Sequence, residues 1–434
     1  MRILFVSTNV PVPANSGQSI RSLSILRALA SSNHELSFVS FSDGDRSKDL
    51  SSLSSLCRSV KLFERKSTSL TLQRDYLPRL KSMLQAKCYS VERFRSEAFR
   101  DSIRQQIAES TCDAIICDGI YALGNIPETG VPILLNCHNV EFVILQRYAQ
   151  LQSNVLKKRY AELESALMRS EEKKACRKIA GSMVCSQIDL EILQKLCPSL
   201  PISVIPNVVD TDFIQPGKDT SAPGSGPIVL FQGVMDWYPN RDAAESFVRK
   251  ILPLVREKYP NIKFVIAGRN PPVDFVAQFS SDSGIEFTGT VADMRPYLAA
   301  AIVVVVPLRI GGGTRIKILE ACAAGKPVVS TTVGAEGLNL QSGRELLLAD
   351  DPEQFASCVL NLLRDPALRD AFAEAGRRAV VERYSQDALK TSLDSFLARF
   401  NLPSAVREEN TDHGVVPKNK STGPMQSFDR AGES

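Results

Sequence analysis

The segment of residues 303–338, which reads VVVVPLRIGGGTRIKILEACAAGKPVVSTTVGAEGL, constrains the fold more than any other part of the chain. It begins with an apolar, β-branched run, which is typical of a parallel strand buried on both faces. Three consecutive glycines precede a helical pattern over 315–324, and a second apolar run follows at 327–330. The segment therefore predicts a strand, a glycine turn, a helix and a second strand, with backbone N–H groups at the turn that can bind an anion.

The same alternation of strand and helix runs through the rest of the chain, in two series separated by a segment rich in Pro, Gly and Ser at 215–227. Apolar strand patterns lie at 2–7, 34–42, 114–117 and 132–136, and again at 227–232, 262–267, 285–287 and 302–306. Such alternation predicts parallel sheets with right-handed crossovers. We therefore predict an α/β fold of two Rossmann-like, doubly wound parallel-sheet domains that face a cleft.

The same patterns suggest domain boundaries. We expect a first domain over 1–206, a second over 207–384, and a C-terminal helix over 385–400 that packs back on the first domain. Residues 401–434 lack periodic apolar residues and are rich in Ser, Gly, Asn and charge. We expect this tail to be disordered.

Composition excludes several classes of protein. A net charge of +4 over 434 residues does not predict nucleic-acid binding. No apolar stretch approaches the ~20 residues that cross a bilayer, and the first residues, MRILFVST, predict a strand and not a signal peptide. The ten cysteines form no CxxC pair, and the three histidines have no spaced metal-ligand partner. We therefore expect reduced thiols, a cytoplasmic protein and no metal site.

One segment, residues 57–104, is strongly basic. It carries twelve Lys and Arg against five Asp and Glu, with leucines interleaved. This pattern is compatible with a solvated basic face. It is also compatible with contact to an anionic membrane surface or to an acceptor that carries phosphate.

The glycine turn and the helix after it carry the residue types that bind a nucleoside diphosphate. The three glycines at 311–313 let the backbone approach a ligand, and free N–H groups at the helix start favour a diphosphate. Arg315 and Lys317 are expected in the first helical turn, where each cation opposes the helix dipole by about 0.3–1 kcal/mol. That cost is reasonable if an anion is bound there. Glu320 follows one turn later and can accept hydrogen bonds from both hydroxyls of a ribose.

Polar residues at the ends of predicted strands in the first half are further candidates. Asp118 and His138 each follow an apolar strand, and ligands of open α/β sheets lie beyond the carboxyl ends of the strands. Gly17 follows the first strand in a loop without a GxGxxG pattern, so no dinucleotide fingerprint is present. Gly17 is compatible with a tight turn or with close approach of the backbone to a ligand.

In these and other motifs the chain resembles the glycosyltransferases of family 4. The matching motifs are GGGTRIKILEACAAGKPVVSTTVGAEGL at 311–338, VIPNVVDTDFI at 204–214, LFQGVMDWYPNRDA at 230–243, FVIAGRNP at 264–271, FTGTVADMRPYL at 287–298 and HNVE at 138–141. The resemblance covers residues 1–400 and implies the GT-B fold, with an acceptor-side first domain and a donor-side second domain. It also implies retaining, metal-independent transfer of a sugar from a nucleotide-diphosphate sugar, which is a co-substrate rather than a cofactor.

The resemblance assigns roles to single residues. Glu320 matches the second glutamate of the family's motif of Glu, seven residues and Glu, and would hold the ribose. The first glutamate of that motif falls on Gly312, so backbone N–H groups of the glycine turn are expected to meet the donor sugar. His138 matches the family's first-domain histidine near that sugar.

The chain departs from the family at a second place. The family has an Arg and a Lys after the first strand of the second domain, and these positions fall on Val234 and near Pro239 or Asn240. We therefore expect the leaving diphosphate to be neutralised from elsewhere. The expected catalytic residues are His138, Arg315 and Lys317. The expected donor-binding residues are Gly17, Gly233, Arg241, Gly268, Arg269, Thr290, Val291, Gly311, Gly312, Gly313, Thr314 and Glu320.

Two other functions stay open at this point. An epimerase or a phosphorylase with the same fold would use the same donor site, and the two departures from the family are compatible with a non-catalytic nucleotide-sugar-binding subunit. For a transferase, the basic segment 57–104 suggests a lipid-linked or cell-envelope acceptor. We then expect the protein at the inner face of an anionic membrane, with no nucleic-acid partner.

Overall fold

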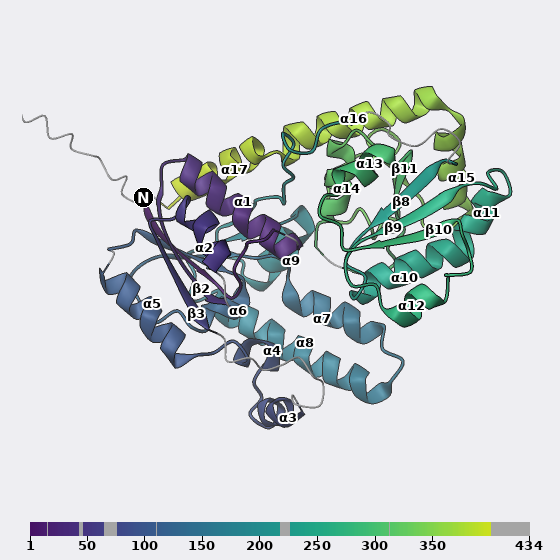
Figure 1. Ribbon diagram of the computed structural model, residues 1–434. Helices are drawn as coiled ribbons and strands as arrows, with labels where there is room; N and C mark the ends of the chain where they lie inside the picture. The colour runs from purple at the N-terminus through teal and green to yellow at the C-terminus, as the bar shows by residue number, and fades with distance from the viewer. Residues whose placement is uncertain are drawn as a thin grey trace, which may run out of the picture. The chain divides into compact units, whose positions relative to one another are not determined.

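A computed structural model of the protein describes residues 1–14, 16–42, 47–64, 76–109, 111–217, 226–311 and 313–400 (Figure 1). Gly312, the predicted tail at 401–434 and residues 65–75 of the basic segment lie outside the described residues.

The first half of the chain forms a parallel sheet of seven strands in the order β3-β2-β1-β4-β5-β6-β7. Its strands are β1 (Arg2–Ser7), β2 (Glu35–Ser42), β3 (Ser59–Glu64), β4 (Ala114–Asp118), β5 (Ile133–Asn136), β6 (Gly181–Val184) and β7 (Ile202–Val204). The register pairs Ser7 with Asp118 and Asp118 with Asn136. Three polar residues therefore lie in a row at the carboxyl edge of the sheet.

Helices cover both faces of this sheet. They are α1 (Gly17–Ser31), α2 (Ser47–Ser54), α3 (Tyr76–Leu84), α4 (Tyr89–Glu92), α5 (Glu97–Glu109), α6 (Ile120–Leu123), α7 (Glu141–Gln150), α8 (Val155–Ala175) and α9 (Gln187–Leu196). Alternate residues of β1 enter different cores, because side chains of a strand alternate between its faces. Ile3 and Phe5 pack with α1, whereas Leu4 and Val6 pack on the other face.

The second half forms a parallel sheet of six strands in the order β10-β9-β8-β11-β12-β13. Its strands are β8 (Ile228–Gln232), β9 (Lys263–Ala267), β10 (Ile285–Gly289), β11 (Val303–Val306), β12 (Val328–Ser330) and β13 (Leu347–Leu348). All four valines of β11 are fully buried. The two parallel sheets confirm the predicted fold class.

The helices of the second half are α10 (Tyr238–Ser246), a π-helical turn (Phe247–Ile251), α11 (Leu252–Arg256), α12 (Val273–Ala277), α13 (Arg295–Ala300), α14 (Ile316–Ala323), α15 (Pro352–Arg364) and α16 (Pro366–Tyr384). In both sheets the direction of winding reverses at the first strand, between β1 and β4 and between β8 and β11. Ligands of doubly wound sheets bind beyond the carboxyl ends of the strands at such switch points.

The last described helix, α17 (Gln386–Ala398), packs against α1 (Figure 1). Leu389, Leu393 and Phe396 are buried in the same core as Ile3 and Phe5. The Gln386 amide also donates to the backbone oxygen of Ser24 over 2.6 Å. The exact domain boundaries stay a prediction.

Two expectations need correction. Cys176 and Cys197 form a disulfide, so not all cysteines are reduced. They end α8 and α9, and their Cα atoms are 6.0 Å apart although 21 residues separate them in sequence, so the fold and not the spacing brings them together. The helix of the opening segment begins at Ile316, and Arg315 is its N-cap residue. In the part of the chain that the structure describes, no helix combines the length and apolarity needed for a transmembrane span.

Leu393→Ala should lower the free energy of unfolding by about 2–5 kcal/mol, because it opens a cavity between α17 and the first sheet. Leu156→Ala is the control, since Leu156 is 81% exposed and its truncation should change stability by about 0.5 kcal/mol or less. Urea denaturation checks both. A Leu393→Ala protein as stable as the control would contradict the packing of α17 in this core.

Candidate functional site

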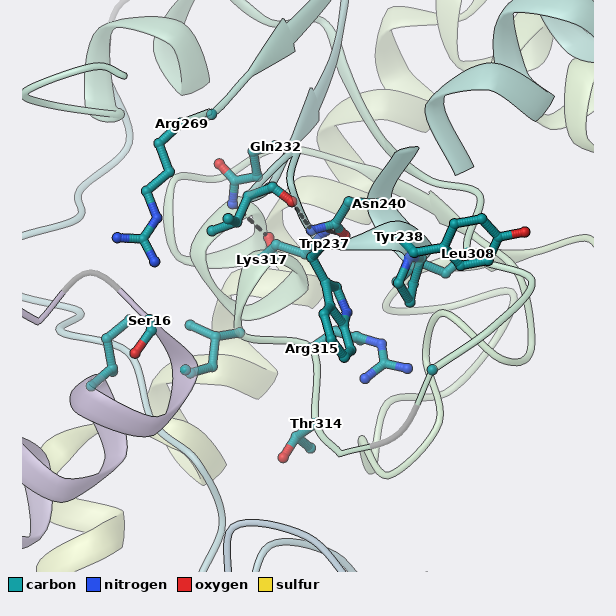
Figure 2. A pocket seen from close by; sticks show the side chains of 18 of the residues that line it. Ser16, Gln232, Trp237, Tyr238, Asn240, Arg269, Leu308, Thr314, Arg315 and Lys317 are labelled. Carbon is teal, nitrogen blue, oxygen red and sulfur yellow. Dashed lines mark hydrogen bonds between the residues drawn. The ribbon is translucent and has the colours of Figure 1, made fainter. Parts of the chain in front are cut away.

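A cavity of about 810 Å³ lies at the carboxyl ends of both sheets (Figure 2). From the first half, the start of α1 and the helix α7 line it. From the second half, the ends of β8 and β9, the glycine turn and α14 line it. The cavity therefore coincides with the switch points of the two sheets.

Lys317 lies on the wall of this cavity, in the first turn of α14. Its ammonium donates to Asn240 Oδ1 over 2.8 Å and lies 4.6 Å from the centre of the Phe231 ring. A Cβ at Gly233 would come within 2.8 Å of the Lys317 nitrogen, so a side chain at this position would displace the ammonium. Burial, together with the charge of Arg315, lowers the pKa of Lys317 to about 7. An anion in the cavity would reverse that shift.

Glu320 lies one helical turn further on the same face of α14. Its carboxylate accepts a hydrogen bond of 2.7 Å from the side-chain amide of Gln232, the last residue of β8. Burial raises the pKa of Glu320 to about 7, although Lys317 and the Gln232 hydrogen bond oppose the shift. An anchored carboxylate on the cavity wall can accept hydrogen bonds from the hydroxyls of a ligand.

The first half of the chain holds the glycine turn in place. Arg147 of α7 donates to the backbone oxygen of Gly311 over 2.7 Å and forms a two-pronged ion pair with Glu336, over 2.6 and 2.7 Å. Asn207 donates to the Thr314 hydroxyl over 2.8 Å. Gly313 has a φ of +71°, and a Cβ there would lie 2.4 Å from Asn139 Oδ1.

Arg315 lies on the cavity wall between this turn and α14. Its guanidinium donates to the backbone oxygen of Gly313 over 2.8 Å. Burial lowers its pKa to about 10, with Glu336 opposing and Arg147 adding to the shift. Arg315 therefore keeps its charge at neutral pH and adds a second cation beside Lys317.

His138 does not line this cavity, although its neighbour Asn139 does. Its Nε2 lies 2.8 Å from Asp118 Oδ1, and its side chain is 11% exposed. Burial alone would raise the pKa of Asp118, but the His138 charge and the hydrogen bonds from His138, Ser22 and Ser7 lower it overall. The structure thus places His138 in a contact with Asp118 and outside the lining of this cavity.

Most of the residues predicted from the sequence line this one cavity. They are Gly17, Gly233, Gly268, Arg269, Thr290, Val291, Gly311, Thr314, Arg315, Lys317 and Glu320. The described residues His138, Arg241 and Gly313 lie outside the lining, and the expected roles of all these residues stay predictions. Among the described residues, no group of three or more His, Cys, Asp and Glu side chains could hold a metal ion.

Sequence reasoning missed several residues of the site. Gln232 and Asn240 hold Glu320 and Lys317, and Arg147 holds the turn. Trp237, the single tryptophan of the chain, and Tyr238 stand on the wall with exposed fractions of 56% and 49% (Figure 2). The available signals were a polar residue at the end of an apolar strand and two neighbouring aromatic residues, which begin the next helix.

Comparisons with known proteins point to one family. A model described as Glycosyltransferase Family 4 matches residues 15–213, and a model described as Glycosyl transferases group 1 matches residues 226–365. An uncharacterized 44.6 kDa protein in the cps region of Klebsiella pneumoniae is 22% identical over 374 residues, which are 83% of this chain and 90% of that protein.

Two further comparisons concern a mannosyltransferase and a solved structure. A GDP-mannose-dependent alpha-(1-6)-phosphatidylinositol monomannoside mannosyltransferase of Mycobacterium tuberculosis is 28% identical over 221 residues, which are 46% of this chain and 56% of that enzyme. The structure of sucrose-phosphate synthase from Thermosynechococcus elongatus has a TM-score of 0.69 at 18% identity and covers 92% of this chain and 99% of its own. This likeness shows that the fold is GT-B.

Lys317→Met should raise the free energy of unfolding at pH 6 by on the order of 2 kcal/mol. The folded-state pKa of Lys317 is lowered, so between about pH 7 and 10.5 the unfolded chain binds the extra proton and stability rises with pH. Below pH 7 the folded protein must keep the buried charge. The gain from Lys317→Met should therefore shrink as the pH rises above 7. Urea denaturation from pH 6 to 9, with the exposed Lys258→Met as control, checks this, and a pH-independent gain would contradict it.

Proposed function

Because the chain belongs to glycosyltransferase family 4, we propose that it transfers a hexosyl group from a nucleotide-diphosphate sugar to a lipid-linked or cell-envelope glycan. In this proposal the anomeric configuration is retained and no metal takes part. The second half binds the donor and the first half binds the acceptor. Lys317 and Arg315 neutralise the diphosphate, and Glu320 holds the ribose.

The observation that carries this proposal is the contact between Lys317 and Asn240. Asn240 stands near the place where the family has a lysine after the first strand of the second domain. Here its amide oxygen accepts a hydrogen bond from the Lys317 ammonium over 2.8 Å, so a cation from α14 occupies that place. This supports a donor site in which the positive charge is kept although its position in the sequence has changed.

These cations have a direct role in the chemistry. When the bond between the sugar and the β-phosphate breaks, negative charge develops on the diphosphate. Fixed cations and backbone N–H groups stabilise that charge without reorganising, which is the usual way in which a protein replaces a metal ion. Lys317 takes up a proton as the diphosphate binds, because its pKa in the free protein is about 7.

The ribose would sit beside Glu320. The Gln232 amide fixes one carboxylate oxygen, and the other can accept hydrogen bonds from ribose hydroxyls. The raised pKa of Glu320 falls again if such hydroxyls bond to its ionised form. Lys317 and Glu320 face the cavity from one helix, so diphosphate and ribose would bind in adjacent positions.

The acceptor proposal rests on the relatives and on one surface. The relative from Klebsiella pneumoniae belongs to a cps region, and the mycobacterial relative is named for phosphatidylinositol monomannoside. In this chain, α3 exposes Leu80 and Leu84, and α8 exposes Leu156 beside Lys157 and Lys158. Exposed leucines among basic residues favour contact with an anionic membrane.

Saturating donor should change the fluorescence of Trp237, because this single tryptophan stands on the cavity wall. We would test UDP- and GDP-sugars, and a donor at ~100 times its dissociation constant should add ~2.7 kcal/mol of stability.

Arg315→Ala and Lys317→Met should lower turnover by about 10²–10³. Lys258→Met is the exposed control. Transfer should persist in EDTA, and NMR of the product should show a retained anomeric configuration.

The same assay separates the alternatives. With a donor whose sugar is labelled, label that stays on the nucleotide would point to an epimerase. Donor binding without hydrolysis or transfer over a wide acceptor panel would point to a non-catalytic subunit. Near-normal turnover of Arg315→Ala and Lys317→Met would contradict the diphosphate assignment.

The membrane contact predicts that the protein sediments with vesicles of anionic lipid at low salt. Leu80→Ser with Leu84→Ser should reduce sedimentation at least threefold, since burying each leucine contributes about 1.5–3 kcal/mol. Val273→Ser, which replaces another exposed apolar residue (86%), is the control. Equal sedimentation of the α3 variant and the wild type would remove α3 from the contact surface.

A further inference from the structure

A second cavity, of about 250 Å³, lies beside the first at the carboxyl end of β1. The loop of residues 9–13, the start of α1, Asp118 and Arg269 line it. Ser16 and Arg269 line both cavities. Figure 2 shows the Arg269 side chain extending from the end of β9 toward Ser16. The two cavities therefore meet at these two residues.

The Arg269 guanidinium has no acceptor within hydrogen-bond distance among the described residues, and its Nε is fully buried. By contrast, Arg147 on the first cavity is paired with Glu336, and the nearby Arg309 is paired with Asp242. A buried donor without an acceptor costs about 1–3 kcal/mol, and more when the group is charged. This cost would be offset if a ligand supplied the acceptor.

Asp118 cannot be that acceptor, although it lines the same cavity. Its two oxygens already accept hydrogen bonds from Ser7, Ser22 and Asn136, over 2.8, 2.8 and 2.7 Å, and one of them lies 2.8 Å from His138 Nε2. The oxygens of Asp118 are thus occupied by hydrogen bonds from residues of the first half of the chain. The cavity keeps an unpaired cation beside neutral polar groups such as Gln18 and Asn9.

We propose that this second cavity binds an anionic group of the acceptor, a phosphate or a carboxylate, and that Arg269 contacts it. The proposal rests on the proposed transferase function and names the acceptor class. The donor diphosphate is assigned to Lys317 and Arg315, and the second cavity lies on the side of the first sheet. An acceptor anchored there would present its hydroxyl to the donor where the cavities meet, at Ser16 and Arg269. Arg269 then belongs to the acceptor set and not to the donor set.

The test is a second-ligand titration with UDP already saturating, so that the donor cavity is filled. Inorganic phosphate is the minimal probe, and unfolding midpoints are compared with those in chloride of equal ionic strength. Wild type should show saturable stabilisation by phosphate. Arg269→Gln should weaken the apparent phosphate affinity at least tenfold, and Arg269→Lys should keep most of it. Arg249→Gln, which lies outside both cavities and removes an exposed ion pair with Glu245, should match wild type.

Two further arms separate the sources of the anion. A comparison of glucose 6-phosphate with glucose tests whether the anion belongs to a soluble sugar phosphate. Vesicles containing phosphatidylinositol against neutral phosphatidylcholine vesicles test a lipid headgroup. In each arm, the anionic member should stabilise the wild type more than the neutral member does. This difference in unfolding midpoint should vanish in Arg269→Gln.

Three outcomes of this titration would contradict the assignment of Arg269 to the acceptor. Absence of saturable phosphate stabilisation in wild type, or its persistence in Arg269→Gln, would overturn the proposal. A loss of UDP affinity in Arg269→Gln would return Arg269 to the donor site and overturn it equally. Failure of the proposed function is separate, since wild type would then gain no stability from UDP or any nucleotide sugar in the same experiment.

Discussion

The ammonium of Lys317 is the constraint around which the donor-facing wall of the cavity in the second half is arranged. Its pKa of about 7 shows that the free protein holds this charge at a cost to stability. Gly233 leaves room for the ammonium, Asn240 gives it an oxygen and Phe231 offers the face of its ring. Residues from a strand, the loop after it and helix α10 thus keep a cation at the switch point of the second sheet, where a bound anion would relieve its cost.

The first half contributes to the same site through the glycine turn. Arg147 and Asn207 contact Gly311 and Thr314 from the first half, and the Arg147 side chain also joins Glu336. A turn with two positive-φ glycines has few conformational restraints of its own. These contacts restrict it, so the geometry of the turn in the second half depends on residues of the first half of the chain. A hydrogen-bonded turn is also pre-organised, which lowers the entropy lost when a ligand binds.

The sequence predicted the elements of the site better than the contacts that hold it. The run of valines in β11, the glycines and the spacing of Lys317 and Glu320 are local patterns, and the structure places them on one cavity. Arg147 and Gly311 are 164 residues apart, and Asn207 and Thr314 are 107 apart. No local pattern identifies such pairs, because only the packing of the two sheets brings them together. The pairing of Cys176 with Cys197 was missed for the same reason.

The two unusual cations, Lys317 and Arg269, differ in a way that fits separate tasks. A lysine loses its proton when burial outweighs its partners, so Lys317 can be neutral in the free protein and charged when an anion arrives. An arginine stays protonated in almost any environment, and its planar guanidinium can bind a phosphate or carboxylate through two parallel hydrogen bonds. An arginine keeps its charge in a half-buried place with no acceptor among the described residues, and position 269 has one. In the proposed enzyme each cation would then bind a different anion. Lys317 would bind the diphosphate that leaves with the nucleotide, and Arg269 would bind the phosphate or carboxylate of the acceptor.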